Sequence, residues 1–129
     1  METNKDFLLR SIANLINFIE KLFKKGKPSL EIVSVYIDNF FEEKYKNTIN
    51  QFIEKPFDEV IQIIHEGNVE NIKDFADVLF IRFELENTNP IKANLSEFIL
   101  NLYDYYQKES SVYSLEIQSK ILTLKKRNF

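Results

Sequence analysis

The side chains of this sequence that are best placed to do chemistry are four carboxylates of one predicted helix. Glu70, Asp74, Asp77 and Glu84 recur at steps of four, three and seven residues. Because an α-helix has 3.6 residues per turn, these carboxylates share one face. Such a face can recognise a basic protein or hold a divalent cation. It can equally be an ordinary solvated face, which Lys73 favours because it can pair with Asp77 one turn later.

Tyrosines gather in the next predicted helix and form a second candidate for binding. Tyr103 and Tyr106 share its apolar stripe, so we expect both rings to pack in the core with their hydroxyls at the rim. Tyr105 lies roughly opposite and should be exposed, and exposed tyrosines are common in protein interfaces. A cation site needs ligands from several elements, so we favour partner recognition over metal binding. The predicted partner-binding residues are Asp74, Asp77, Glu84 and Tyr105.

Catalytic motifs are missing from the sequence. The chain has one histidine, no cysteine and two glycines, which excludes thiolate chemistry and leaves too few glycines for a phosphate-binding loop. His65 has no strong metal ligand three or four residues away on either side. We interpret it as a surface or half-buried residue in the last turn of a helix. We therefore predict no enzyme, no catalytic residue, no metal site and no cofactor.

Length and charge limit the remaining classes. A chain of 129 residues with 44% hydrophobic residues predicts one domain, 1–129. Its net charge is −3, and residues 54–97 carry ten acidic against four basic side chains. An acidic body argues against nucleic acid, although Lys120, Lys125, Lys126 and Arg127 could contact phosphates. We see neither a secretory leader nor a membrane span, so we expect a cytoplasmic protein that does not bind membranes.

Apolar residues recur at three- and four-residue steps throughout, which predicts an all-α fold of five to seven antiparallel helices. The expected helices cover residues 5–25, 29–45, 47–66 with an interruption at Lys55–Pro56, 70–86, a segment that starts at Asn89–Pro90 or near Asn94 and ends at Ser110–Ser111, and 113–126. Val33, Val35 and Ile37 also alternate as in a strand, but the residues that follow keep the helical period. Gly26 and Gly67 fit left-handed positions after helix ends, and Pro28 supports a break after the first.

Weak internal similarity suggests that the predicted helices form hairpins. Ile72, Ala76 and Leu79 align with Leu115, Ser119 and Leu122 at an offset of 43, and with residues of the 29–45 helix at an offset of 39. The unequal offsets are compatible with diverged repeats or with unrelated amphipathic helices. The hairpins could form a compact bundle or a short solenoid.

Two resemblances rest on short segments. The segment from Glu66 to Ala76, followed by Asn87-Thr-Asn-Pro90, resembles the second half of a tetratricopeptide repeat, which implies packed helix hairpins. The segments Asp6-Phe-Leu-Leu-Arg10 and Tyr113-Ser-Leu-Glu116 are similar to a family of short uncharacterised bacterial helical proteins. That family implies helical hairpins and no established activity.

Taken together, these features predict a non-catalytic protein-interaction module of the bacterial cytoplasm, with another protein, basic in character, as its partner. Two alternatives stay open: an immunity- or antitoxin-like inhibitor of a basic toxin, whose acidic face would steer association, and a carrier of an apolar ligand suggested by the twelve phenylalanines. The sequence also leaves open a homo-oligomer.

Overall fold

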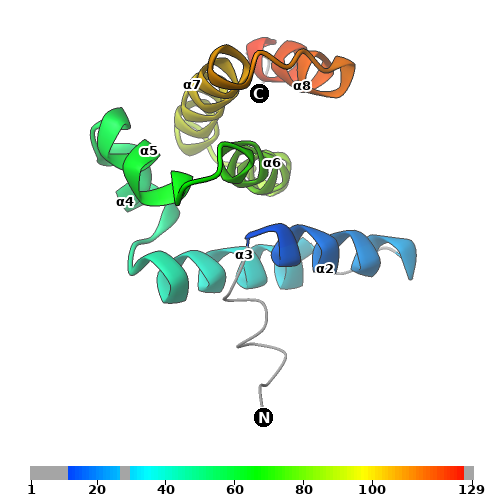
Figure 1. Cartoon of the computed structure of the whole chain (residues 1–129). Helices are drawn as coiled ribbons and strands as arrows, with labels where there is room; N and C mark the ends of the chain where they lie inside the picture. Colours follow the sequence, from blue (N-terminus) through cyan, green and yellow to red (C-terminus); the bar gives the residue numbers. More distant parts are fainter. Residues whose placement is uncertain (1–11, 27–29, 127–129) are drawn as a thin grey trace. The chain divides into compact units, whose positions relative to one another are not determined.

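The computed structural model describes residues 12–26 and 30–126, and every regular element in these ranges is an α-helix (Figure 1). The seven helices in the described ranges are α2 (Ile12–Lys24), α3 (Leu30–Tyr45), α4 (Ile49–Glu54), α5 (Phe57–His65), α6 (Glu70–Leu85), α7 (Ile91–Ser110) and α8 (Leu115–Lys125). The predicted all-α class is confirmed. Helix α3 includes the segment with strand-like alternation, so the helical period decides there.

Local sequence signals account for most helix ends. Thr48 caps α4 in a capping box, in which its hydroxyl accepts from the Gln51 N–H and the Gln51 side chain accepts from the Thr48 N–H. Pro56 separates α4 from α5, as predicted. Gly26 and Gly67 both have positive φ angles, of 135° and 76°, in agreement with their expected positions after helices.

The structure also settles where α7 and α8 begin. Helix α7 begins at Ile91, directly after Pro90, so the earlier of the two expected starts is confirmed. Ser114 caps α8 through its hydroxyl, which accepts from the Ile117 N–H at 3.4 Å. The predicted start of the first helix at residue 5, the Asp6–Arg10 segment, Pro28 and Arg127 all lie outside the described residues.

The chain, predicted as one domain over 1–129, divides into two compact units, Met1–Val60 and Ile61–Phe129. In the first unit, α2 and α3 lie side by side (Figure 1). An aromatic cluster joins α3 to α4 in this unit, because the Phe41 and Tyr45 rings lie 6.0 Å and 5.2 Å from the ring of Phe52. Edge-to-face contacts of this kind stabilise a core beyond the area they bury.

The second unit contains α6, α7 and α8, and α7 packs against both of the others. Helix α6 is the most deeply buried of the three. Its buried residues are Ile72, Phe75, Ala76, Asp77, Val78, Leu79, Phe80 and Phe83. In helix α8 only Ile117 and Leu124 are buried. Among the described helices, none has the length and apolar character needed to cross a membrane.

Candidate functional site

Asp77 lies at the centre of a polar network that joins the three helices of the second unit. Only 8% of this residue is exposed. Its carboxylate accepts a hydrogen bond from the Tyr103 hydroxyl of α7 at 2.5 Å and forms ion pairs with Lys73 of α6 at 2.8 Å and Lys120 of α8 at 3.1 Å. A buried carboxylate needs such partners, because burying an unpaired charge is strongly unfavourable. We call Asp77, Tyr103, Lys73 and Lys120 the Asp77 network.

Helix periodicity explains why these side chains meet. Lys73 and Asp77 are one turn apart on α6, which confirms the predicted pairing. Tyr103 lies on the buried stripe of α7, so its ring packs inside while its hydroxyl reaches α6. Lys120 also pairs with Glu116 one turn earlier at 3.1 Å, and its ammonium lies 5.6 Å from the ring centre of Phe80.

Proton affinities in the network follow from burial and from the charge of Asp77. Burial, the carboxylate charge and the hydrogen bond together raise the pKa of Tyr103 far above its ordinary value, so its hydroxyl remains a donor. Burial alone would lower the pKa of Lys73, but the hydrogen bond and charge of Asp77 outweigh it and raise that pKa. Both groups keep their protons at neutral pH, so the network acts as a structural tie between helices.

Glu70, two helix turns before Asp77 on α6, makes a second contact of the same type. Its carboxylate accepts from the Tyr106 hydroxyl of α7 at 2.7 Å. Burial and the Glu70 hydrogen bond raise the pKa of Tyr106 above its ordinary value. The buried rings of Tyr103 and Tyr106 confirm the predicted core packing, but the Tyr103 hydroxyl is fully buried and not at the rim of the core as expected. Two of the four carboxylates on the α6 stripe therefore bind α7.

The structure separates the four predicted partner-binding residues. Asp77 is buried in its network, which corrects the expectation that it faces solvent: α7 packs against α6, and Lys120 of α8 reaches the carboxylate. Asp74 is half-buried, and burial raises the pKa of its carboxyl, with Lys73 opposing the shift. Tyr105 is half-buried rather than exposed, and Glu84 is exposed as expected. A binding role for these residues stays a prediction.

Apolar side chains on the outer side of α8 form the surface that sequence reasoning missed. The exposed fractions are 45% for Val112, 80% for Tyr113, 90% for Leu115 and 65% for Leu122. We call these four residues the outer face of α8; Leu115 and Leu122 are in the helix, and Val112 and Tyr113 lie in the segment just before it. The sequence grouped Leu115 and Leu122 with the apolar residues of the last helix, but the buried side of α8 carries Ile117 and Leu124 instead.

A signal for this outer face exists in the sequence. Leu115 and Leu122 are seven residues apart, and so are Ile117 and Leu124, while the two pairs are offset by two residues. Two residues turn a helix through about 200°, so the pairs lie on opposite sides of α8. Helix α8 therefore has two apolar sides. The described part of the chain covers the side with Ile117 and Leu124 and leaves the side with Leu115 and Leu122 exposed.

His65 ends α5 and is half-buried, as predicted; its Nδ1 accepts from the Gly67 N–H at 3.1 Å. This contact stabilises the turn before α6. No group of three or more acidic, histidine or cysteine side chains suited to a metal ion occurs in the described part of the chain.

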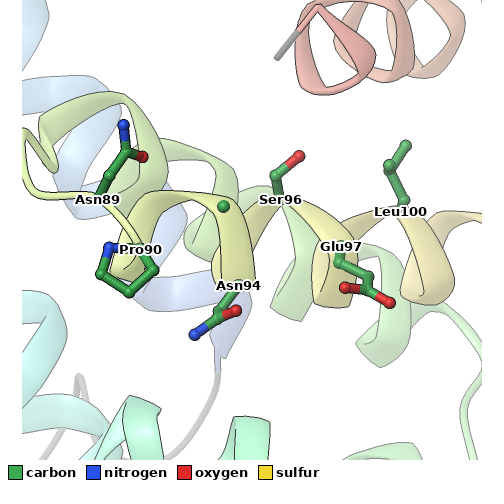
Figure 2. Close-up of a pocket in the computed structure, with 7 residues that line it drawn as sticks. Asn89, Pro90, Asn94, Ser96, Glu97 and Leu100 are labelled. Atoms are coloured by element: carbon green, nitrogen blue, oxygen red, sulfur yellow. The ribbon is translucent and has the colours of Figure 1, made fainter. Parts of the chain in front are cut away.

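A shallow pocket of about 340 Å³ lies at the start of α7 (Figure 2). Its lining residues are Asn89, Pro90, Ala93, Asn94, Ser96, Glu97 and Leu100. Ser96 and Leu100 project on the same side of α7 in Figure 2. The Ser96 hydroxyl donates to the carbonyl oxygen of Leu124 at 2.7 Å, so it fastens the end of α8 to α7. The lining offers one carboxylate and several neutral groups, which do not make a nucleophile and base pair.

Fold and site together define an all-helical domain with internally bound carboxylates and an exposed apolar helix side. Comparison with models of protein families, with curated proteins and with solved structures gives no match. The resemblances to tetratricopeptide repeats and to short bacterial helical proteins therefore stay predictions.

Proposed function

We propose that the protein is a non-catalytic protein-interaction module that binds its partner through the outer face of α8. The observation that carries this proposal is the exposure of Tyr113, Leu115 and Leu122, each more than three-fifths accessible to solvent. Scattered exposed apolar residues are normal, but large ones that neighbour each other, here on α8 and in the segment just before it, are typical of interaction sites. Tyr113 adds a ring with a hydroxyl, a side chain that binding sites favour.

Burial of this surface would supply a useful binding free energy. Covering a leucine or tyrosine side chain of this size contributes about 1.5–3 kcal/mol. Three such residues could offset part of the entropy lost on association. The contribution is large enough for a specific contact and too small for a permanent assembly, so we expect reversible binding.

The polar ties of α8 support the same proposal, because they hold its outer face in one orientation. Lys120 binds Asp77 of α6, and the Leu124 carbonyl accepts from Ser96 of α7. These contacts act on the inner side of α8 and leave Leu115 and Leu122 on the other side. A surface held in its binding geometry before contact loses less conformational entropy on association.

The inhibitor of a basic toxin is the weaker alternative, because it depends on the acidic stripe of α6. Glu70 and Asp77 of that stripe are engaged by tyrosine hydroxyls, and Asp77 is also paired with two lysines. Charge steering would then rest on Glu70, which keeps its charge, and on Asp74 and Glu84, because the lysines balance only Asp77. The apolar-ligand carrier stays a prediction from the phenylalanine content.

Photo-crosslinking in the native cell tests the proposal. A photoreactive amino acid replaces Leu115 in one variant and Asn101, an exposed residue of α7, in the control. We expect a discrete protein adduct from position 115 and none from position 101. Equal labelling from both positions, or no adduct from position 115, would contradict the proposal.

A further inference from the structure

We propose that the partner of the outer face of α8 is a second copy of this chain, with the two α8 helices packed antiparallel. This inference rests on the proposed function, since it names the occupant of the same surface. A dimer with twofold symmetry uses one patch twice, so the patch must be complementary to itself. The sequence of α8 meets this requirement in both its apolar and its charged residues.

The apolar residues have the pattern of a helix that packs against another helix. Helix α8 has a large-small-large pattern at spacings of four and three, made by Leu115, Ser119 and Leu122. Helix α6 has the same pattern in Ile72, Ala76 and Leu79. Those three α6 side chains are fully buried. A small residue between two large ones lets a neighbouring helix approach, because the interaxial distance depends on the side chains at the contact. On α8 this pattern faces solvent.

Antiparallel packing places the large residues against each other. A twofold axis near Ser119 sets Leu115 of one copy opposite Leu122 of the other, on both sides of the axis. The small Ser119 side chains lie at the centre, where the helices come closest. In a parallel arrangement each leucine would meet its own equivalent instead, and so would each charge.

Charges at the two ends of α8 select the antiparallel orientation. Lys126 follows Leu115 by eleven residues, or about three turns, and so lies on the same side of the helix. Glu116, in the first turn, is next to this side, and its side chain is largely exposed. Antiparallel packing about this axis sets Lys126 of each copy about five residues, or roughly 7 Å along the helix, from Glu116 of the other, a gap that the two long side chains can span together. Parallel packing would bring like charges together.

The size of the contact predicts a weak dimer. Helix α8 has eleven residues and is therefore about 16 Å long. A single pair of helices this short buries less than the roughly 1,200 Å² of a standard interface. We therefore expect a dissociation constant of tens to hundreds of micromolar, on the order expected for a transient contact.

Sedimentation equilibrium of the purified full chain tests the inference. We expect the apparent mass to rise from the monomer value of 15.4 kDa toward twice that value as the concentration increases from about 10 µM to about 1 mM. Leu115→Glu should weaken association at least about tenfold, whereas Asn101→Glu adds the same charge elsewhere and should leave it unchanged. Far-UV circular dichroism checks that both variants keep their helices.

Charge exchange tests the orientation. Glu116→Lys and Lys126→Glu should each weaken the dimer, and the chain carrying both substitutions should associate more strongly than either single variant. A wild-type chain that stays monomeric at about 1 mM, or a dimer that Leu115→Glu leaves intact, overturns the inference. A monomer that still gives an adduct with a different protein from position 115 rejects self-association and leaves the proposed function in place. A monomer with no adduct rejects both.

Discussion

Removal of the Asp77 carboxylate should destabilise the protein more than removal of any exposed carboxylate. In Asp77→Ala the buried Tyr103 hydroxyl loses its acceptor, which costs about 1–3 kcal/mol. Lys73 and Lys120 also lose their pair, but their side chains are 25% and 21% exposed and can turn toward water. Each lost pair should therefore cost only about 0.5–1 kcal/mol. We expect the free energy of unfolding to fall by about 2–5 kcal/mol in total, the sum of the lost hydroxyl acceptor and the two lost pairs.

Urea unfolding followed by circular dichroism measures this change. Asp77→Asn should cost less, about 1–2 kcal/mol, because the amide oxygen can still accept from the Tyr103 hydroxyl. A double-mutant cycle of Asp77→Ala with Tyr103→Phe should give a coupling of about 1–2 kcal/mol.

The control is Asp104→Ala, which removes an exposed carboxylate paired with Lys108 at 3.0 Å on the surface of α7. Its expected cost is below about 0.5 kcal/mol. If Asp77→Ala cost no more than Asp104→Ala, the tie between α6, α7 and α8 would not be the stabilising contact described above.

Three further results are expected. The pKa values of Tyr103 and Tyr106 are raised in the folded chain, so the folded chain holds these two protons more tightly than the unfolded chain. The resulting stabilisation is complete below about pH 10 and declines at higher pH. Above about pH 10 the urea midpoint should therefore fall, and it should fall less when both residues are replaced by Phe. Burial raises the pKa of Asp74, so Asp74→Asn should raise the urea midpoint at pH 7, and its advantage should disappear once acid protonates the carboxyl. Ser96→Ala should cost about 1 kcal/mol and speed amide hydrogen exchange in the last turn of α8, because the Leu124 carbonyl loses its donor; unchanged exchange would contradict that role.

Local signals made most helices predictable from the sequence. The predicted helix 70–86 is observed as α6, Glu70–Leu85, and the break at Pro56 lies between α4 and α5. Apolar periodicity and proline act within one or two turns, so they can be read without knowing the fold. The strand-like Val33–Ile37 segment shows that a short alternation gives way when the longer helical period continues around it.

The partners of Asp77 show where local reasoning ends. Its pairing with Lys73 was predictable because both residues are on one helix. Tyr103 and Lys120 are 26 and 43 residues away, and only the packing of α6, α7 and α8 brings them to the same carboxylate. The acidic stripe therefore looks like a continuous surface in the sequence, whereas the structure buries Asp77 in its middle.

The outer face of α8 was missed for a different reason. The spacing of apolar residues predicts which of them share one side of a helix, but it does not predict which side a neighbouring helix covers. Helix α8 has apolar residues on two opposite sides, and the choice between Leu115 and Ile117 depends on its contacts with α7.

The central claim, that α8 directs an apolar surface to solvent, is tested most directly by thiol labelling. The chain has no cysteine, so single Leu115→Cys and Ile117→Cys variants carry one reporter each. At low micromolar concentration, where any dimer is dissociated, we expect the thiol at position 115 to react with a maleimide at the rate of an unfolded chain and the thiol at position 117 to be strongly protected. Equal protection at both positions, or faster labelling at position 117, would contradict the account.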